Sequence, residues 1–127
     1  MRSISTPNAP AARGHYSQAV VHGDLVYVAG QLPIDPADPG GRLESFEAQA
    51  RQVLANVAAI LDAAGSSLDR VLKATVYITD LAHWPQFNAI YAQALGAHRP
   101  ARTVVPVAGL HYGYLVEMDV IAALRDS

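Results

Sequence analysis

The sequence predicts an α+β domain in which two helices pack on one face of a β-sheet. Apolar residues recur at three- and four-residue steps in segments 46–64 and 84–95, a spacing typical of amphipathic helices. Segments before, between and after them alternate apolar and polar residues, as strands do. The resulting order is β-β-α-β-α-β-β. Helices with one apolar stripe each need a shared sheet face to cover it, which gives the α+β class.

The first part of the chain predicts an arm followed by a hairpin. Residues 1–14 contain two prolines, so we expect an N-terminal arm, with the folded body starting near Tyr16. The β-rich runs 16–21 and 25–29 flank a His-Gly-Asp tripeptide. Gly23 suits the tight turn between two antiparallel strands.

A connection rich in proline and glycine separates the hairpin from the first helix. Gly30 ends the second strand, and segment 31–42 has too many prolines and glycines for a regular element. Ser45 is the expected N-cap of the helix and Gly65 its expected C-terminal stop. The polar face of this helix is expected to carry Glu47, Arg51, Asn56 and Asp62.

The second half predicts three strands around the other helix. Segment 71–79 alternates, and its aliphatic face, expected under the helices, carries Leu72, Ala74, Val76 and Ile78. Its other face is half polar, which suits burial against another subunit. Helix 84–95 follows, with Pro85 in its first turn and Gly96 at its end. Strands 101–107 and 114–124, joined by a turn, complete the sheet.

Composition limits the classes of function. The 127 residues predict a single domain, 51% hydrophobic and 16% charged. A net charge of -2 and a single lysine, Lys73, disfavour nucleic-acid binding. There is no cysteine, and the five histidines lack paired spacing with carboxylates, so we expect no metal and no cofactor. The sequence contains no apolar run of membrane-spanning length, and we expect a cytoplasmic protein that does not bind membranes.

Two charges stand where packing alone would favour aliphatic residues. Arg102 opens a run of β-branched residues, and Glu117 lies within another apolar run. A buried charge is costly without a partner. Either Arg102 pairs with Glu117 or Asp119 within the chain, or a ligand balances it.

Six stretches, in order and in register, resemble the reactive intermediate deaminases, the RidA family also labelled YjgF/YER057c/UK114. They are GHYSQAV at 14–20, VAGQLPIDP at 28–36, QARQVLAN at 49–56, AAGSSL at 63–68, FNAIY at 87–91 and PAR at 100–102. The resemblance implies a chorismate-mutase-like fold of the bacillus type. It also implies a homotrimer whose sheets form a barrel, with active sites in the clefts between subunits.

The resemblance also implies an activity: hydrolysis of the enamine or imine of a small 2-amino acid, such as 2-aminoacrylate, to a 2-keto acid and ammonia. Arg102 matches the family's substrate arginine, and a guanidinium can hold a carboxylate through two hydrogen bonds. Glu117 matches the residue that holds the attacking water. By the same resemblance, backbone N-H groups of Gly30 and Val104 complete the carboxylate pocket.

Two further residues, Tyr16 and Asn88, match family positions that line the pocket. Each assignment has a structural alternative. Glu117 could serve trimer packing, Gly30 could only end a strand, and Tyr16 and Asn88 could be packing and loop-bonding residues.

The chain departs from the family pattern most at Leu110-His-Tyr-Gly113. The rings there could favour a larger or flatter substrate, and His111 could assist proton transfer. Smaller departures are Ala29, where many members have serine, and Val104, where many have cysteine. Other functions stay open: a specialised pathway deaminase, a non-catalytic trimer that binds small carboxylates, and a ribonuclease, which the absence of a basic patch disfavours.

Overall fold

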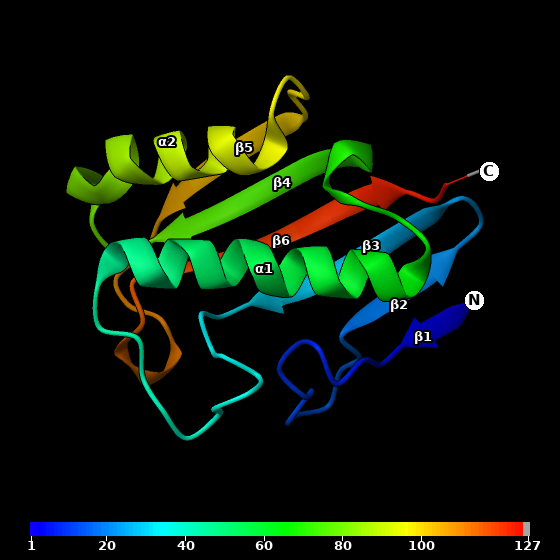
Figure 1. The fold of residues 1–127 in the computed structure, drawn as a ribbon, viewed down its shortest axis with the longest axis horizontal. Coiled ribbons are helices and arrows are strands. Elements are labelled where there is room, and N and C mark those ends of the chain that lie inside the picture. Colours follow the sequence, from blue (N-terminus) through cyan, green and yellow to red (C-terminus); the bar gives the residue numbers. More distant parts are fainter. Residues whose placement is uncertain (126–127) are drawn as a thin grey trace.

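A computed structural model describes residues 1–125 as one mixed β-sheet with both helices on the same face (Figure 1). The strand order across the sheet is β1-β2-β3-β6-β4-β5, with β4 and β5 parallel and the other neighbours antiparallel. The predicted α+β class is confirmed. The elements are β1 (Arg2–Ile4), β2 (Ala19–His22), β3 (Leu25–Gln31), α1 (Phe46–Ala64), β4 (Val71–Ile78), α2 (Trp84–Leu95), β5 (Ala101–Pro106) and β6 (Val116–Ala123).

Both helices begin and end where the sequence predicted. The Ser45 side chain accepts a hydrogen bond of 3.1 Å from the Ala48 N-H, which satisfies one of the free donors of the first turn of α1. Gly65 ends α1 with a φ of 85°, a left-handed conformation that costs glycine little. Helix α2 starts at Trp84 and stops at Gly96.

The hydrophobic core lies between the helices and the sheet. Its fully buried side chains include Val53, Val57, Ile60 and Leu61 of α1, Phe87 of α2, and Val76, Ile78, Val116 and Met118 of the central strands. Two expectations about faces are wrong. Leu72 is 49% exposed because a register shift between Val71 and Lys73 turns it away from the helices. Asn56 is fully buried rather than on the polar face of α1.

Asn56 has a specific reason for its burial. Its amide donates to the carbonyl oxygens of Leu32 and Ile34, at 3.1 and 2.9 Å. The long connection between β3 and α1 has no regular backbone pairing, so these bonds satisfy carbonyl groups that the helix covers. Asn56 therefore fastens the start of this connection to α1.

The N-terminal segment is part of the folded body, which corrects the prediction of a simple arm. Strand β1 pairs with the outer edge of β2, and Ile4 is 5% exposed. The buried Gln18 amide holds the following loop through a bond from the Thr6 N-H and bonds to the carbonyl groups of Thr6 and Pro10. A three-residue edge strand is too short to show a recognisable alternation in the sequence.

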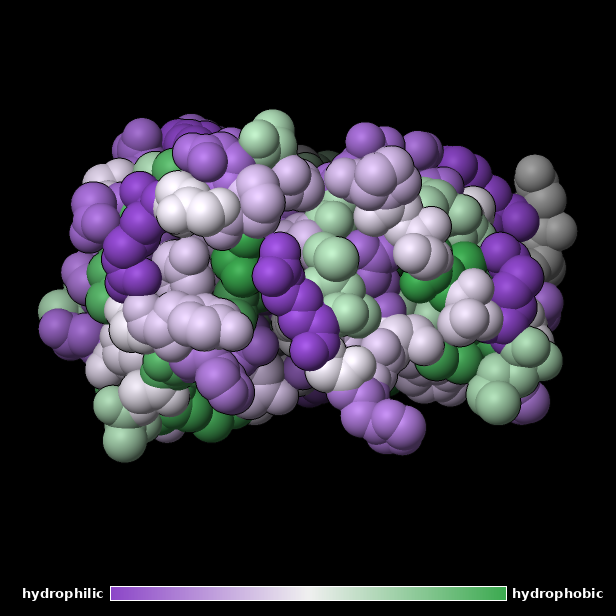
Figure 2. Space-filling model, turned by 90° about the horizontal axis from the view of Figure 1, so that it is seen from below, coloured by the Kyte–Doolittle hydropathy of each residue, from purple (hydrophilic) through white to green (hydrophobic). Residues whose placement is uncertain are grey.

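The side of the molecule that carries the 31–45 connection has a mixed surface. Figure 2 shows hydrophobic and hydrophilic side chains interspersed there. Within residues 1–125, none of the helices combines the length and the apolar character needed to cross a bilayer.

Candidate functional site

Arg102 is held at the open edge of the sheet by three side chains of α2. Its Nη1 donates to Asn88 Oδ1 at 3.0 Å. Its guanidinium lies 4.6 Å from the ring centroid of Trp84 and 4.8 Å from that of Tyr91. The three α2 residues are spaced i, i+4 and i+7, so one face of the helix presents all of them. The hydrogen bond and the two ring contacts together orient the guanidinium.

Within residues 1–125, the Arg102 guanidinium makes no ion pair with a carboxylate. A guanidinium carries five N-H donors, and Asn88 accepts only one of them. Tyr91 adds a second polar group, since its hydroxyl is buried and has no hydrogen-bond partner among the described residues. Burial raises the pKa of Tyr91, while the nearby Arg102 charge opposes the rise. The guanidinium therefore has several N-H donors left for a carboxylate.

The backbone of β5 adds a donor at the same edge. The Val107 N-H donates to the Ile78 carbonyl at 2.9 Å, which directs this N-H toward β4. Successive N-H groups of a strand alternate in direction, so the Val104 N-H is directed away from β4, toward the open edge. The N-H of Val104 thus lies on the side of β5 that a second molecule or chain can reach.

Glu117 lies on the other face of the sheet. It is paired with Tyr77 of β4, while its neighbours Val116 and Met118 are buried toward the helices. Burial raises the pKa of the Glu117 carboxyl, and Asp119 adds to the rise, while His111 opposes it. A carboxyl group with a raised pKa can exchange protons closer to neutrality.

Gly30 makes room for the Glu117 carboxylate. Val28 pairs with Val120 and Gln31 with Met118, so β3 has one extra residue at this point, a β-bulge. A Cβ added to Gly30 would lie 2.7 Å from Glu117 Oε2. The present position of the Glu117 carboxylate therefore depends on glycine here, and Gly30 does not end the strand, which continues to Gln31.

An open groove runs past Glu117 and Gly30. Its lining includes Tyr16, His111, Tyr112 and Tyr114, together with parts of the N-terminal loop and of the connection that follows β3. Tyr16 and Tyr112 are exposed large aromatic residues. The groove brings together Tyr16, Gly30 and Glu117, three of the residues predicted for the site.

The predicted residues form two groups that one chain does not join. Arg102, Asn88 and Val104 lie at the β5 edge, and Arg102 is aligned with Ala74, whose side chain is buried under the helices. Glu117 projects from the opposite face. The alternative in which Arg102 pairs with Glu117 or with Asp119 is therefore wrong. Asp119 instead accepts a hydrogen bond from the Tyr77 hydroxyl at 3.0 Å.

Three residues of these regions carried no prediction from the sequence. Trp84 and Tyr91 stand four residues before and three residues after Asn88, and that helical spacing could have identified them as a cradle for Arg102. Arg42, which contacts the turn beside the groove, follows a proline- and glycine-rich run without periodicity. Among residues 1–125, no three histidine or acidic side chains gather as metal ligands would.

Comparisons with known proteins identify the family. The family described as Endoribonuclease L-PSP matches residues 6–124. A 2-iminobutanoate/2-iminopropanoate deaminase of Salmonella typhimurium is 42% identical over 127 residues, covering 98% of each protein. The crystal structure of RidA from the Antarctic bacterium Psychrobacter sp. matches with a TM-score of 0.94 and 44% identity, covering 98% of this chain and 100% of that one. E. coli TdcF with bound serine matches with a TM-score of 0.92 and 38% identity, covering 97% and 98%. The chain belongs to the Endoribonuclease L-PSP family, the family of the RidA (YjgF) proteins.

Proposed function

We propose that the protein is an imine deaminase that hydrolyses 2-imino acids, and the enamines that tautomerise to them, to 2-keto acids and ammonia. One observation carries the proposal: Arg102 is oriented by Asn88, Trp84 and Tyr91, yet makes no ion pair within residues 1–125. An oriented guanidinium with free donors suits a carboxylate ligand. The Salmonella deaminase and the serine bound to TdcF support a small amino-acid-like substrate.

Arg102 is the proposed anchor of the substrate. Two of its N-H groups would hold the two carboxylate oxygens in parallel, which fixes the plane of the substrate. The Val104 N-H, at the same open edge, would add a third bond. Asn88 keeps the guanidinium in position, and we propose that it lines the pocket as well.

Glu117 is the proposed base for the attacking water. The carboxylate takes a proton from the water as the water oxygen adds to the C=N carbon, and passes it to the imine nitrogen, which gives a neutral carbinolamine. Glu117 then takes the hydroxyl proton and passes it to the amine nitrogen as the C=O bond forms, the C-N bond breaks and ammonia leaves. The raised pKa of Glu117 suits both steps, and Tyr16 and Gly30 border it in the groove.

We propose that a homotrimer completes the site, with Arg102 of one chain beside Glu117 of the next. The two residues lie on opposite faces of the sheet in one chain, so a shared site needs a second copy. The face that carries Glu117 is half polar and bears Thr75, Tyr77 and Ile121 away from the helices. Such a face suits the inside of a barrel formed by three sheets.

The test is an assay with an imine made during the reaction. An amino-acid oxidase or dehydratase supplies 2-iminopropanoate or 2-aminoacrylate, and keto-acid release is followed with wild type, Arg102→Ala and Arg99→Ala. Arg99 is a matched control because it is an exposed arginine three residues away. We expect acceleration by wild type and by Arg99→Ala, and a loss of about 100-fold or more in Arg102→Ala.

The competing reading is a trimer that binds small carboxylates without turnover. It predicts that pyruvate binds wild type with measurable heat and that Arg102→Ala abolishes the binding, while neither protein accelerates keto-acid release over buffer. That combination of results would refute the deaminase proposal.

A further inference from the structure

The turn that joins β5 to β6 holds a tyrosine in an unusual conformation. Tyr112 has φ 61° and ψ 14°, in the left-handed region that tyrosine rarely adopts, and among the described residues it is the only non-glycine with positive φ. The same ring is 67% exposed. Backbone strain at an exposed residue is a feature found at functional sites, which makes the Tyr112 side chain a candidate for a functional role.

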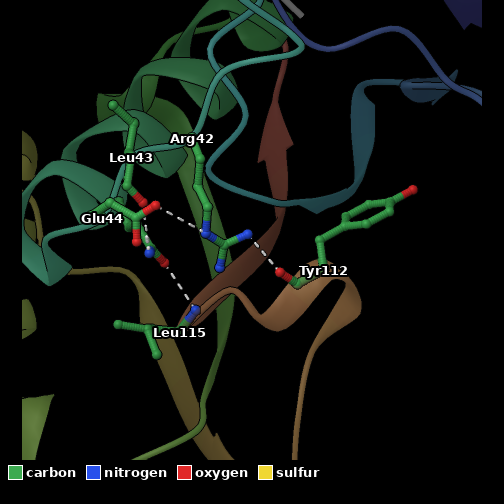
Figure 3. Close-up of polar contacts among 6 residues, drawn as sticks. Arg42, Leu43, Glu44, Tyr112 and Leu115 are labelled. Atoms are coloured by element: carbon green, nitrogen blue, oxygen red, sulfur yellow. Dashed lines mark hydrogen bonds and ion pairs between the residues drawn. The ribbon is translucent and has the colours of Figure 1, made fainter.

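Arg42 fastens this turn to the connection between β3 and α1 (Figure 3). Its Nη1 donates to the Tyr112 carbonyl at 2.6 Å. Its guanidinium lies 4.6 Å from the ring centroid of Tyr114, and its Nε is 3.5 Å from Glu44 Oε1. Arg42 thus satisfies the carbonyl of the strained residue and contacts a ring two positions further along.

A second link ties the same two segments together. The Leu115 N-H donates to Gln49 Oε1 at 2.9 Å, and Gln49 Nε2 donates to the Leu43 carbonyl at 3.0 Å. Gln49 is buried, so its position is set by the packing of α1. The turn is therefore attached at Tyr112 and at Leu115, on either side of Gly113 and Tyr114.

Three rings of the turn form a continuous cluster beside Glu117. The centroids of His111 and Tyr112 are 5.9 Å apart, and those of Tyr112 and Tyr114 are 6.2 Å apart with the rings nearly perpendicular. Tyr114 is buried and contacts Tyr112, which in turn contacts His111, and both of these rings are exposed. All three border the groove that contains Glu117. We call His111, Tyr112 and Tyr114 the aromatic wall.

We infer that Arg42 is a positioning residue that fixes the aromatic wall of the Glu117 groove, and that this wall selects imino acids with a planar or aromatic side chain. The inference rests on the proposed function and names its substrate class. A flat side chain can lie against the exposed rings, which stand on a fastened turn, so it gains contact area with little loss of side-chain freedom. The methyl side chain of the alanine imine is too small to gain a comparable contact area.

The experiment compares two imines supplied by an amino-acid oxidase, one from alanine and one from phenylalanine. The variants are Arg42→Ala, which releases the wall, and Tyr112→Asn, which removes one ring but tolerates the left-handed conformation. Arg51→Ala is the control, because Arg51 is an exposed α1 residue paired with Glu47 at 3.6 Å. We expect wild type to prefer the phenylalanine imine. In both variants, kcat/KM for the phenylalanine imine divided by kcat/KM for the alanine imine should fall about five- to tenfold, and the control should not change this ratio.

Two results would overturn the inference: a wild type that prefers the alanine imine, and an unchanged ratio of the two kcat/KM values in both variants. If the unchanged ratio came from equal losses on both imines and the oligomeric state changed in gel filtration, the wall would pack against a neighbouring copy instead.

Failure of the proposed function would look different. If wild type hydrolysed neither imine, the deaminase proposal would fail, and the wall is then tested by calorimetric binding of phenylpyruvate against pyruvate. The same five- to tenfold change in the affinity ratio is expected in the two variants. An unchanged affinity ratio would overturn the inference on its own.

Discussion

The Arg102 edge and the Glu117 groove are built in contrasting ways. The edge consists of regular elements: Arg102 stands on β5, and Asn88, Trp84 and Tyr91 stand on one face of α2. The groove is lined by a bulged strand, loops and a turn with a left-handed tyrosine. Rigid elements hold a side chain more closely than loops do, whereas loops vary with less cost to the fold.

This difference matches a division of chemical tasks. Every 2-imino acid has the same carboxylate, so the proposed anchor can be part of the invariant framework. The side chain differs among substrates, and the proposed selecting surface lies on the turn where the sequence departs most from the RidA pattern. In the proposed site, the contact common to all substrates lies on secondary structure and the variable contact lies on a fastened loop.

The largest expected effect tests the separation of the two regions directly. Arg102→Ala and Glu117→Ala should each be nearly inactive. When the two variants are unfolded together and refolded in equal amounts, a trimer with sites between neighbouring chains regains activity in about one quarter of its sites. The reason is that a site is intact only where one chain supplies Arg102 and the next supplies Glu117. Keto-acid release by the mixture, relative to refolded wild type, measures this fraction.

The experiment distinguishes two arrangements, because a site built within one chain would recover no activity. If each site used both residues of one chain, every chain in the mixture would carry a defect. Mixing the two proteins without unfolding is the control, since no recovery is expected unless subunits exchange. Absence of activity after refolding, with the trimer re-formed, would refute the site between chains.

The fold was predictable because its signals are local. The Ser45 cap, the Gly65 stop and the helical spacing of α2 each depend on a few neighbouring residues, and each predicted boundary is confirmed. Strand β1 and the register shift before Lys73 were missed. A three-residue strand carries too few side chains for a pattern, and a bulge changes which face a residue occupies without changing the composition.

The candidate site was predictable only in part. The sequence led to Arg102, Asn88 and Glu117, but it did not reveal that one chain keeps the arginine and the glutamate on opposite faces. Which face each residue occupies depends on strand register. The alternation of apolar and polar residues specifies the register only when the pairing of the strands is known. Arg42 was missed because its contact with Tyr112 joins positions that are 70 residues apart.

A smaller effect would show how closely the groove is fitted. In Gly30→Ala the added methyl group would lie 2.7 Å from Glu117 Oε2, so the carboxylate must move. Moving the carboxylate out of its position should lower kcat about 10- to 100-fold. Gly40→Ala is the matched control, because a Cβ there meets nothing within 4 Å. Equal activity of the two variants in the imine assay would contradict a catalytic position for Glu117.

The smallest effect concerns the pH dependence of stability. Burial raises the pKa of Glu117, so the unfolded chain releases this proton at lower pH than the folded protein does. Wild type should lose stability relative to Glu117→Gln as the pH rises from the ordinary range of a carboxyl group through the raised value. The melting temperatures should agree near about pH 4, and Glu117→Gln should melt higher near about pH 8.

The same measurement shows whether the Glu117 carboxylate is unpaired in the groove or forms an ion pair with another subunit. Asp62→Asn, on the exposed side of α1, gives the effect of removing one surface carboxylate. If wild type melted higher than Glu117→Gln near about pH 8, the charged Glu117 would be stabilised by a cation from elsewhere in the assembled protein. Because Glu117 makes no ion pair within residues 1–125, a cation of a second copy is the expected source. The sign of this one difference therefore distinguishes an unpaired buried base from a carboxylate held in a salt bridge between chains.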